Sequence, residues 1–154
     1  QSNPLRAFAV ADLTPAYAKN AEKVLRGVAL VDRKQVLVQD EIRSANAGKV
    51  WWFMHTSAQA ALNSDRTTAT LTQGTARLSA RILSPPGATF SIMDAQPLAT
   101  SPQPTEQAKN QGIRKLALNL GDAANVRLAV LLVPLREGEA LPELQPPVVP
   151  LAEW

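Results

Sequence analysis

Short aliphatic runs separated by polar turns constrain the fold of this chain more than any other feature. The clearest case joins residues 24–31 (VLRGVALV) to residues 35–42 (QVLVQDEI) through Asp32-Arg33-Lys34. Two such runs around a short polar turn predict a β-hairpin. The nearly continuous aliphatic centre further predicts strands that are buried on both faces. A period of two dominates most of the sequence, so the chain is expected to be all-β.

Further strands follow from the same pattern. A second hairpin is expected around Gln73-Gly74-Thr75, where Leu78, Ala80 and Ile82 alternate with polar residues, as in a sheet with one solvated face. In all, the expected strands cover residues 7–13, 24–31, 35–42, 50–56, 67–72, 76–83, 113–120 and 126–133, the last two forming a third hairpin around 121–125. About eight strands favour an antiparallel two-sheet β-sandwich.

Two proline-rich segments interrupt this pattern. Residues 85–112 and 134–154 each carry five prolines, so both are expected to be long loops or extended cover. A long connection in a compact domain is usually functional, which makes 85–112 a place to expect ligand or partner contacts. The predicted domains are a sandwich over 1–134 and a Pro-rich tail over 135–154 that wraps the sheet or hangs free. One or two helical turns are expected at 15–23, capped by Thr14.

Size, charge and cysteine content exclude several classes of protein. A chain of 154 residues suits one domain, and its longest apolar run, 128–133, is far below the roughly 20 residues that span a bilayer. The net charge of +3 comes from dispersed basic residues, which predicts no nucleic-acid partner. With no cysteine, disulfides and thiolate metal sites are excluded. The start at Gln1, without a signal segment, predicts part of a longer or processed polypeptide.

The stretch 49–56 (KVWWFMHT) holds two of the three tryptophans and the only histidine. As a strand it places Trp52 on one face and Trp51, with His55, on the other. Because both faces carry large apolar groups, a buried central strand is the favoured interpretation. Stacking of the indoles on sugar rings and chemistry at the lone histidine are the alternatives.

Searches for catalytic and metal-binding motifs give little. There is no glycine-rich phosphate loop, no nucleophile elbow, and too few histidines for a triad or a multi-histidine metal site. A pair of carboxylates for glycoside hydrolysis is not excluded by the sequence, because such pairs meet only in space. Asp40-Glu41, however, is expected to be a solvated turn at a strand end. Tyr17, the only tyrosine, is expected to be a packed side chain with a solvated hydroxyl. Its alternative role is that of a proton donor or acceptor in polysaccharide elimination.

Six segments, taken in order, resemble one known family. They are residues 11–17 (ADLTPAY), 26–33 (RGVALVDR), 36–41 (VLVQDE), 50–56 (VWWFMHT), 80–87 (ARILSPPG) and 128–134 (LAVLLVP). Each segment alone consists mostly of ordinary strand and turn residues and is a weak signal. Together, the resemblance extends over residues 7–134. In this order they resemble the β-rich C-terminal part of the heparinase II/III-like polysaccharide lyases.

The resemblance implies a parent enzyme with an N-terminal α/α toroid and a following β-sandwich. Such an enzyme cleaves uronate-containing polysaccharides, such as glycosaminoglycans, by β-elimination. In this family the acid and base residues lie in the toroid, and a structural zinc is bound through His-containing motifs early in the sandwich. None of these motifs occurs here, so the resemblance implies no catalytic residue, no metal ligand and no cofactor in this chain. It also implies a secreted or periplasmic protein.

Two functional hypotheses remain. In the first, the chain is a scaffold and substrate-cleft wall that packs on the missing toroid and is inactive alone. Its substrate partner is an acidic polysaccharide, with Tyr17, Trp51 and His55 as candidate contacts. The alternative is a stand-alone carbohydrate-binding or protein-interaction module, which would need an exposed aromatic platform. The first hypothesis instead predicts an exposed apolar patch larger than about a few hundred Å².

Overall fold

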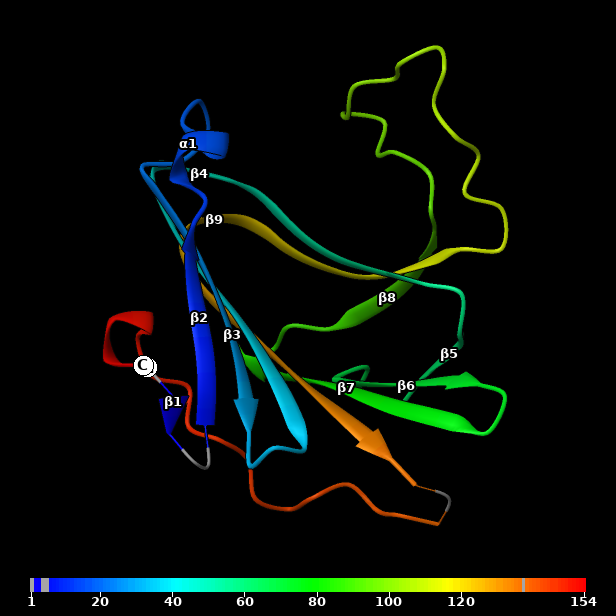
Figure 1. Ribbon diagram of the computed structural model, residues 1–154. Helices are drawn as coiled ribbons and strands as arrows, with labels where there is room; N and C mark the ends of the chain where they lie inside the picture. The colour runs from blue at the N-terminus through cyan, green and yellow to red at the C-terminus, as the bar shows by residue number, and fades with distance from the viewer. Residues whose placement is uncertain (1, 4–5, 137) are drawn as a thin grey trace.

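The computed structural model describes residues 2–3, 6–136 and 138–154, and in this part of the chain nine strands form a single antiparallel sheet (Figure 1). The strand order is β1-β2-β3-β4-β9-β7-β6-β5, and β8 pairs with one half of β9. The elements are β1 Ser2–Asn3, β2 Arg6–Asp12, α1 Thr14–Tyr17, β3 Lys23–Val31, β4 Gln35–Thr56, β5 Gln59–Leu62, β6 Thr68–Gln73, β7 Ala76–Ser84, β8 Phe90–Asp94, β9 Arg114–Leu135 and the 3-10 helix η1 Leu151–Glu153. The all-β antiparallel prediction is confirmed.

The first two predicted hairpins are confirmed. Strands β3 and β4 are joined by a turn in which the Lys34 amide donates to the Val31 carbonyl at 3.0 Å. The φ angles of Asp32 and Arg33 are 49° and 54°, as a type I′ turn requires. Strands β6 and β7 pair around Gly74, whose φ is 59°. The turn residues therefore determine the pairing of β3 with β4 and of β6 with β7.

The third predicted hairpin is wrong. Residues 114–135 form one continuous strand, β9, and residues 50–56 are the second half of β4 instead of a separate strand. The two long strands pair along both halves, from Val36 opposite Leu132 to Thr56 opposite Arg114. Register shifts interrupt this pairing, and Gly121 has a φ of +65° near them. Glycine and polar residues signal irregular backbone, which a bulge satisfies as well as a chain reversal does.

The sheet bends so that its two arms enclose a core. The strand pairing gives one hydrogen-bonded sheet, where the sequence predicted two separate ones. One arm contains β8 with adjoining halves of β4 and β9, and the other contains the remaining halves with β2, β3, β7 and β6. The residues packed together between the arms are Trp52, Ala69, Ala80, Phe90, Leu116, Leu118, Val126, Leu128 and Val130. A single strand pair thus contributes to both walls of this core.

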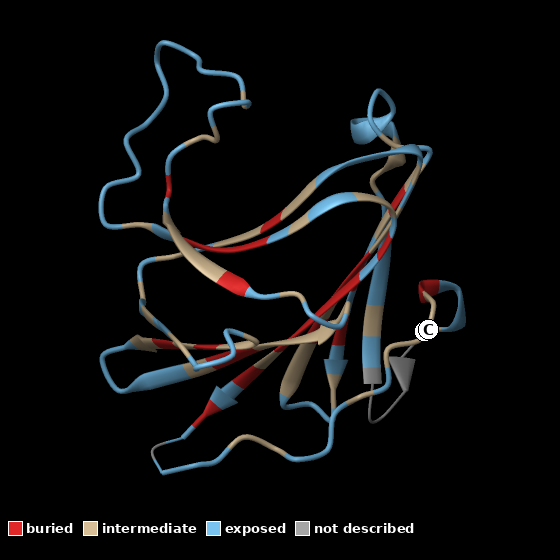
Figure 2. Cartoon of the chain, turned by 180° about the vertical axis from the view of Figure 1, so that it is seen from behind, coloured by how far each residue is buried: buried red, intermediate tan, exposed pale blue. Residues whose placement is uncertain are grey.

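A second apolar cluster lies on the outer face of the sheet. Its buried members are Ala29, Leu37, Ala129, Leu131, Val133 and Leu135, and the C-terminal segment packs against them through Leu141, Val148 and Trp154. Of the two alternatives for the tail, the structure shows that it wraps the sheet. Figure 2 shows the buried residues concentrated along the long strands, while the large loop and the turns are exposed.

Burial of β3 on both faces was expected and is wrong. Val28 and Leu30 are 42% and 40% exposed, because the face that they share with neighbouring β2 has no element packed over it in the described residues. The same correction applies to KVWWFMHT. Trp52 is buried, whereas Trp51 and Phe53 are half-buried and His55 is exposed. One face of this stretch is core and the other is not.

Three smaller corrections concern the connections. Segment 85–112 contains strand β8, so it is not a continuous loop. Helix α1 is a single turn whose N-cap is Leu13, and Thr14 lies inside it. The Thr14 hydroxyl instead accepts a hydrogen bond from the Val24 amide at 3.1 Å, which competes with capping. None of the helices in the described residues is long and apolar enough to cross a membrane.

Candidate functional site

A cleft of about 390 Å³ opens between the bend of the sheet and the connection from β2 to β3. Its charged and aromatic lining comes from α1, β3 and β4, and most of the remaining lining is apolar or small. The residues that give it chemical character are Tyr17, Arg26, Asp40, Lys49, Trp51 and Trp52. Ligand sites are commonly concave, with an apolar lining and a few convergent polar groups, which is the composition of this cleft.

The bend in β4 brings distant parts of one strand to the same cleft. Regular pairing with β9 stops at Arg43 and resumes at Gly48, and a further shift lies between Lys49 and Trp51. A bulge changes the direction in which the following side chains point. Asp40 from before this irregularity therefore lines the same cleft as Lys49 and Trp51 from after it.

Arg26 and Asp40 form a two-pronged ion pair in the cleft. They lie opposite each other on β3 and β4, and the guanidinium donates from Nε to Oδ1 at 2.7 Å and from its Nη2 to Oδ2 at 2.8 Å. The Asp40 side chain is 8% exposed and that of Arg26 is 44% exposed. The hydrogen bonds that Arg26 donates to the Asp40 carboxylate raise the pKa of Arg26. This pair is a fixed, nearly neutral feature of the cleft.

The prediction of a solvated turn at Asp40-Glu41 is wrong. Both residues lie inside β4, Asp40 is buried and Glu41 is half-buried. The pairing across the hairpin explains the error, because a carboxylate can be buried in a sheet when a cation on the neighbouring strand is opposite it. The sequence holds a signal for this pair, since Arg26 and Asp40 are equally distant from Arg33 at the turn.

Tyr17 is placed by a small network at the start of the connection. The Asp12 carboxylate accepts from the Thr14 amide at 2.9 Å and from the Lys23 ammonium at 2.6 Å. The hydrogen bond from Lys23 is the main reason that the pKa of Asp12 is far below its ordinary value. These contacts tie the helix to the first residues of β3. Tyr17, which is 49% exposed, therefore stands at the rim of the cleft.

Trp51 and Lys49 form the opposite wall. The Trp51 indole stacks on Phe53, with ring centroids 5.5 Å apart and planes inclined by 18°. Phe53 is in turn contacted by the Lys115 ammonium at 4.5 Å from the ring centroid. Within the described part of the chain, the exposed Lys49 has no ion-pair partner. The cleft thus combines an aromatic wall with a lysine that forms no ion pair in the described residues, although Asp122 is its cross-strand neighbour on β9.

Two of the three candidate contact residues meet in this cleft. Tyr17 and Trp51 both line it, whereas His55 lies near the far end of β4, opposite Lys115 and outside it. Sequence reasoning missed Arg26 and Asp40, which the hairpin register places opposite each other, and Lys49, whose place in the cleft depends on the bend in β4. In the described residues, no three His, Asp or Glu side chains gather into a group that could hold a metal ion.

Comparisons with known proteins identify the fold. No family model matches the sequence, and no curated protein matches it. Among solved structures, a heparinase III gene product matches with a TM-score of 0.65 and 18% identity, over 88% of this chain and 20% of that chain. Heparan sulfate lyase HepC from Pedobacter heparinus matches with a TM-score of 0.65 and 12% identity, over 91% of this chain and 21% of that one.

The chain therefore spans about a fifth of the length of the solved structures that it matches. Its fold is similar to that of a β-rich portion of these larger lyases. A further structure, titled heparinase III, matches with a TM-score of 0.64 and 13% identity, over 88% of this chain and 20% of that chain. The resemblance drawn from six ordered segments is confirmed at the level of fold.

Proposed function

We propose that this chain is the sandwich portion of a heparinase II/III-like lyase, where it acts as a scaffold and as a wall of the substrate cleft. The observation that supports this proposal is the match of nearly the whole chain to one fifth of several lyase structures. Under this proposal, activity requires the remainder of the enzyme. The parent would cleave uronate-containing polysaccharide by β-elimination, and an α/α toroid would supply its acid and base.

The cleft described above suits the role of a substrate wall. An indole face packs against the apolar face of a pyranose ring, and an ammonium group binds carboxylate or sulfate oxygens through charge-assisted hydrogen bonds. Trp51 and Lys49 provide these two groups in one cleft, which Tyr17 also lines. The proposed partner is an acidic polysaccharide. A secreted or periplasmic location follows from such a substrate.

The proposed binding of substrate by the cleft can be tested with a heparan sulfate oligosaccharide. Its binding is measured from amide chemical-shift changes in NMR spectra. Lys49→Ala and Trp51→Ala are expected to weaken binding about ten-fold each, the equivalent of one lost charge-assisted contact for Lys49 and of one lost ring-stacking contact for Trp51. Lys34→Ala is the matched control, because it removes the same charge at the exposed β3–β4 turn, away from the cleft. Equal weakening by Lys34→Ala would mean that binding is a general effect of positive charge.

An elimination assay tests the lack of chemistry in the isolated chain. With heparin, heparan sulfate and alginate, no increase in the ultraviolet absorbance of unsaturated uronate is expected. A steady increase that Tyr17→Phe or His55→Ala abolished would place catalysis in this chain and overturn the scaffold assignment.

The alternative of a stand-alone carbohydrate-binding module has less support. Such a module needs a flat aromatic surface that is open to a polymer. Trp52 is 6% exposed, and one face of Trp51 is covered by Phe53. The aromatic groups of KVWWFMHT are therefore shared between the core and one wall of a cleft.

A further inference from the structure

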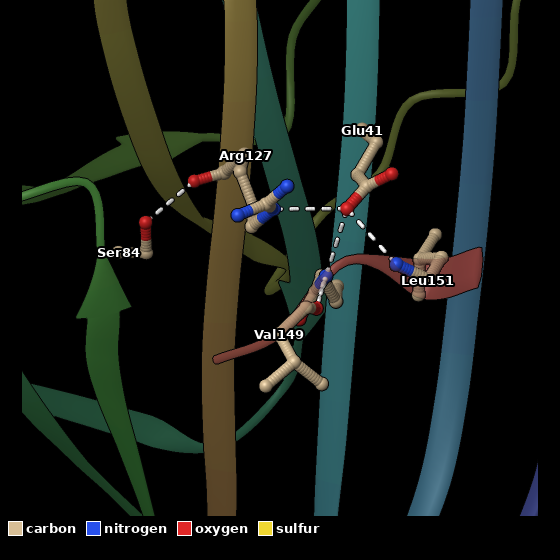
Figure 3. Close-up of polar contacts among 6 residues, drawn as sticks. Glu41, Ser84, Arg127, Val149 and Leu151 are labelled. Carbon is tan, nitrogen blue, oxygen red and sulfur yellow. Dashed lines mark hydrogen bonds and ion pairs between the residues drawn. The ribbon is translucent and has the colours of Figure 1, made fainter. Parts of the chain in front are cut away.

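The last seven residues of the chain occupy a built groove on the outer face of the sheet. Residues 148–154 cross β3 and β4 on the side opposite the main core, and Figure 3 shows their polar contacts. Leu151, within η1, is 4% exposed. This contact is separate from the candidate cleft, which lies on the other face.

Two side chains of β4 bind the backbone of this segment. The side-chain nitrogen Nε2 of Gln39 donates to the Val149 carbonyl at 2.7 Å. Oε1 of Glu41 accepts from the backbone amide of Leu151 at 3.0 Å. Glu41 Oε1 also accepts from Arg127 Nε at 2.9 Å, which fixes the position of the carboxylate. Gln39 is completely buried. Buried polar side chains normally have a partner, and here a partner of Gln39 is the tail itself.

A glycine makes the groove deep enough for the side chains of the segment. A Cβ atom at Gly27 would lie 2.4 Å from Cδ2 of Leu151 and 2.8 Å from Cζ3 of Trp154. Phe8, from β2, closes the same place by contacting the Trp154 ring edge to face, with centroids 5.9 Å apart. The groove therefore has a notch for the Leu151 and Trp154 side chains in addition to its backbone contacts.

The route by which the segment reaches the groove is exposed. Leu144 is 89% exposed, and its neighbours Glu143 and Gln145 are exposed as well. The segment is not a strand of the sheet, so its departure would break no strand pairing. Elements held by few contacts through exposed connections open at lower free energy than the sheet that they cover.

We propose that the outer face of β3 and β4 is a peptide-binding groove, and that residues 148–154 occupy it as a clip that docks and releases as a unit. The groove binds an extended peptide through two backbone contacts, and the Gly27 notch selects a leucine followed three residues later by a tryptophan. Because the clip is not a strand of the sheet, the same peptide can bind from a separate molecule once the chain's own copy is weakened.

Hydrogen exchange in the full chain tests whether the clip opens by itself. Amides of Val149 and of residues 151–154 are expected to exchange at least ten-fold faster than those of the central strands, and Gly27→Ala is expected to accelerate them at least ten-fold more. Gly48→Ala is the matched control, because a Cβ there meets no atom within 4 Å. Exchange of clip and strands at one common rate in every variant would show that the segment is an inseparable part of the fold.

A peptide with the sequence of residues 145–154 tests the groove directly. The full-length Leu151→Ala/Trp154→Ala variant keeps the groove but weakens its own clip, so it is expected to bind the fluorescently labelled peptide at least ten-fold more tightly than the unsubstituted chain. Adding Gly27→Ala should abolish this binding. Absence of binding by the double variant, with its circular dichroism unchanged, would overturn the proposal.

Discussion

Asp40 is a carboxylate held among aliphatic residues, and a single partner, Arg26, contributes both nitrogens that bind it. Arg26→Ala would leave a buried charge without its cation. We expect the free energy of unfolding to fall by about 2 kcal/mol, less than the loss for a fully buried pair, because Arg26 is 44% exposed. The double variant Arg26→Ala/Asp40→Asn removes the charge as well and should recover part of this loss. Urea denaturation of the unsubstituted chain, the single variant and the double variant measures these free energies of unfolding. Equal stability of the single and double variants would contradict the expected recovery.

Asp12 provides a prediction about pH. Its pKa is lowered chiefly by the hydrogen bond from Lys23. A carboxyl group whose pKa falls on folding stabilises the protein above its unfolded pKa of about 3.9 and loses that contribution as pH falls toward the folded value. The unfolding midpoint of the unsubstituted chain should therefore exceed that of Asp12→Asn at pH 7. This difference should shrink below about pH 4. A constant difference from pH 7 to pH 2 would rule out this linkage.

The two long strands carry the bend at element scale, and glycines lie at the irregular places. Gly121 has a φ of +65°, and a Cβ added to it would meet no atom within 4 Å, so Gly121→Ala tests backbone conformation alone. We expect a loss of about 1 kcal/mol in the free energy of unfolding. Gly48→Ala, on the facing strand with no positive φ, should be neutral or slightly stabilising. Equal effects of both substitutions on thermal unfolding would show that Gly121 does not carry the bend.

The same elements explain what the sequence could and could not predict. Hairpins around Arg33 and Gly74 depend on neighbouring residues, so turn chemistry and a period of two were sufficient. The pairing of β4 with β9 joins residues far apart in the chain, and Gly121 resembles an ordinary turn residue. The ion pair of Arg26 with Asp40 could have been inferred from the hairpin register. The approach of Lys49 and Trp51 to this pair could not, because it requires the bend.

At the scale of the whole molecule, the two faces of the sheet are covered by different parts of the chain. Part of the outer face is covered by residues 141–154, and within the described residues the core on the inner face lies where the second arm folds over it. Beyond that arm, Val28 and Leu30 stand exposed beside Ala7 and Ala9 of β2. If the chain is part of a larger lyase, as proposed, this open apolar strip is a place where another part of that enzyme can pack.

The open strip leads to a prediction for the isolated chain. Val28→Thr/Leu30→Thr keeps two strand-compatible side chains but removes apolar surface, so the free energy of unfolding should change by less than about 1 kcal/mol. Binding of a hydrophobic fluorescent dye and self-association in sedimentation velocity should both decrease, because exposed apolar patches drive both. Leu144→Thr is the control, since Leu144 is 89% exposed but lies on the connection to the clip. If Leu144→Thr lowers dye binding and self-association as much as the double variant does, the strip is not a distinct interaction surface.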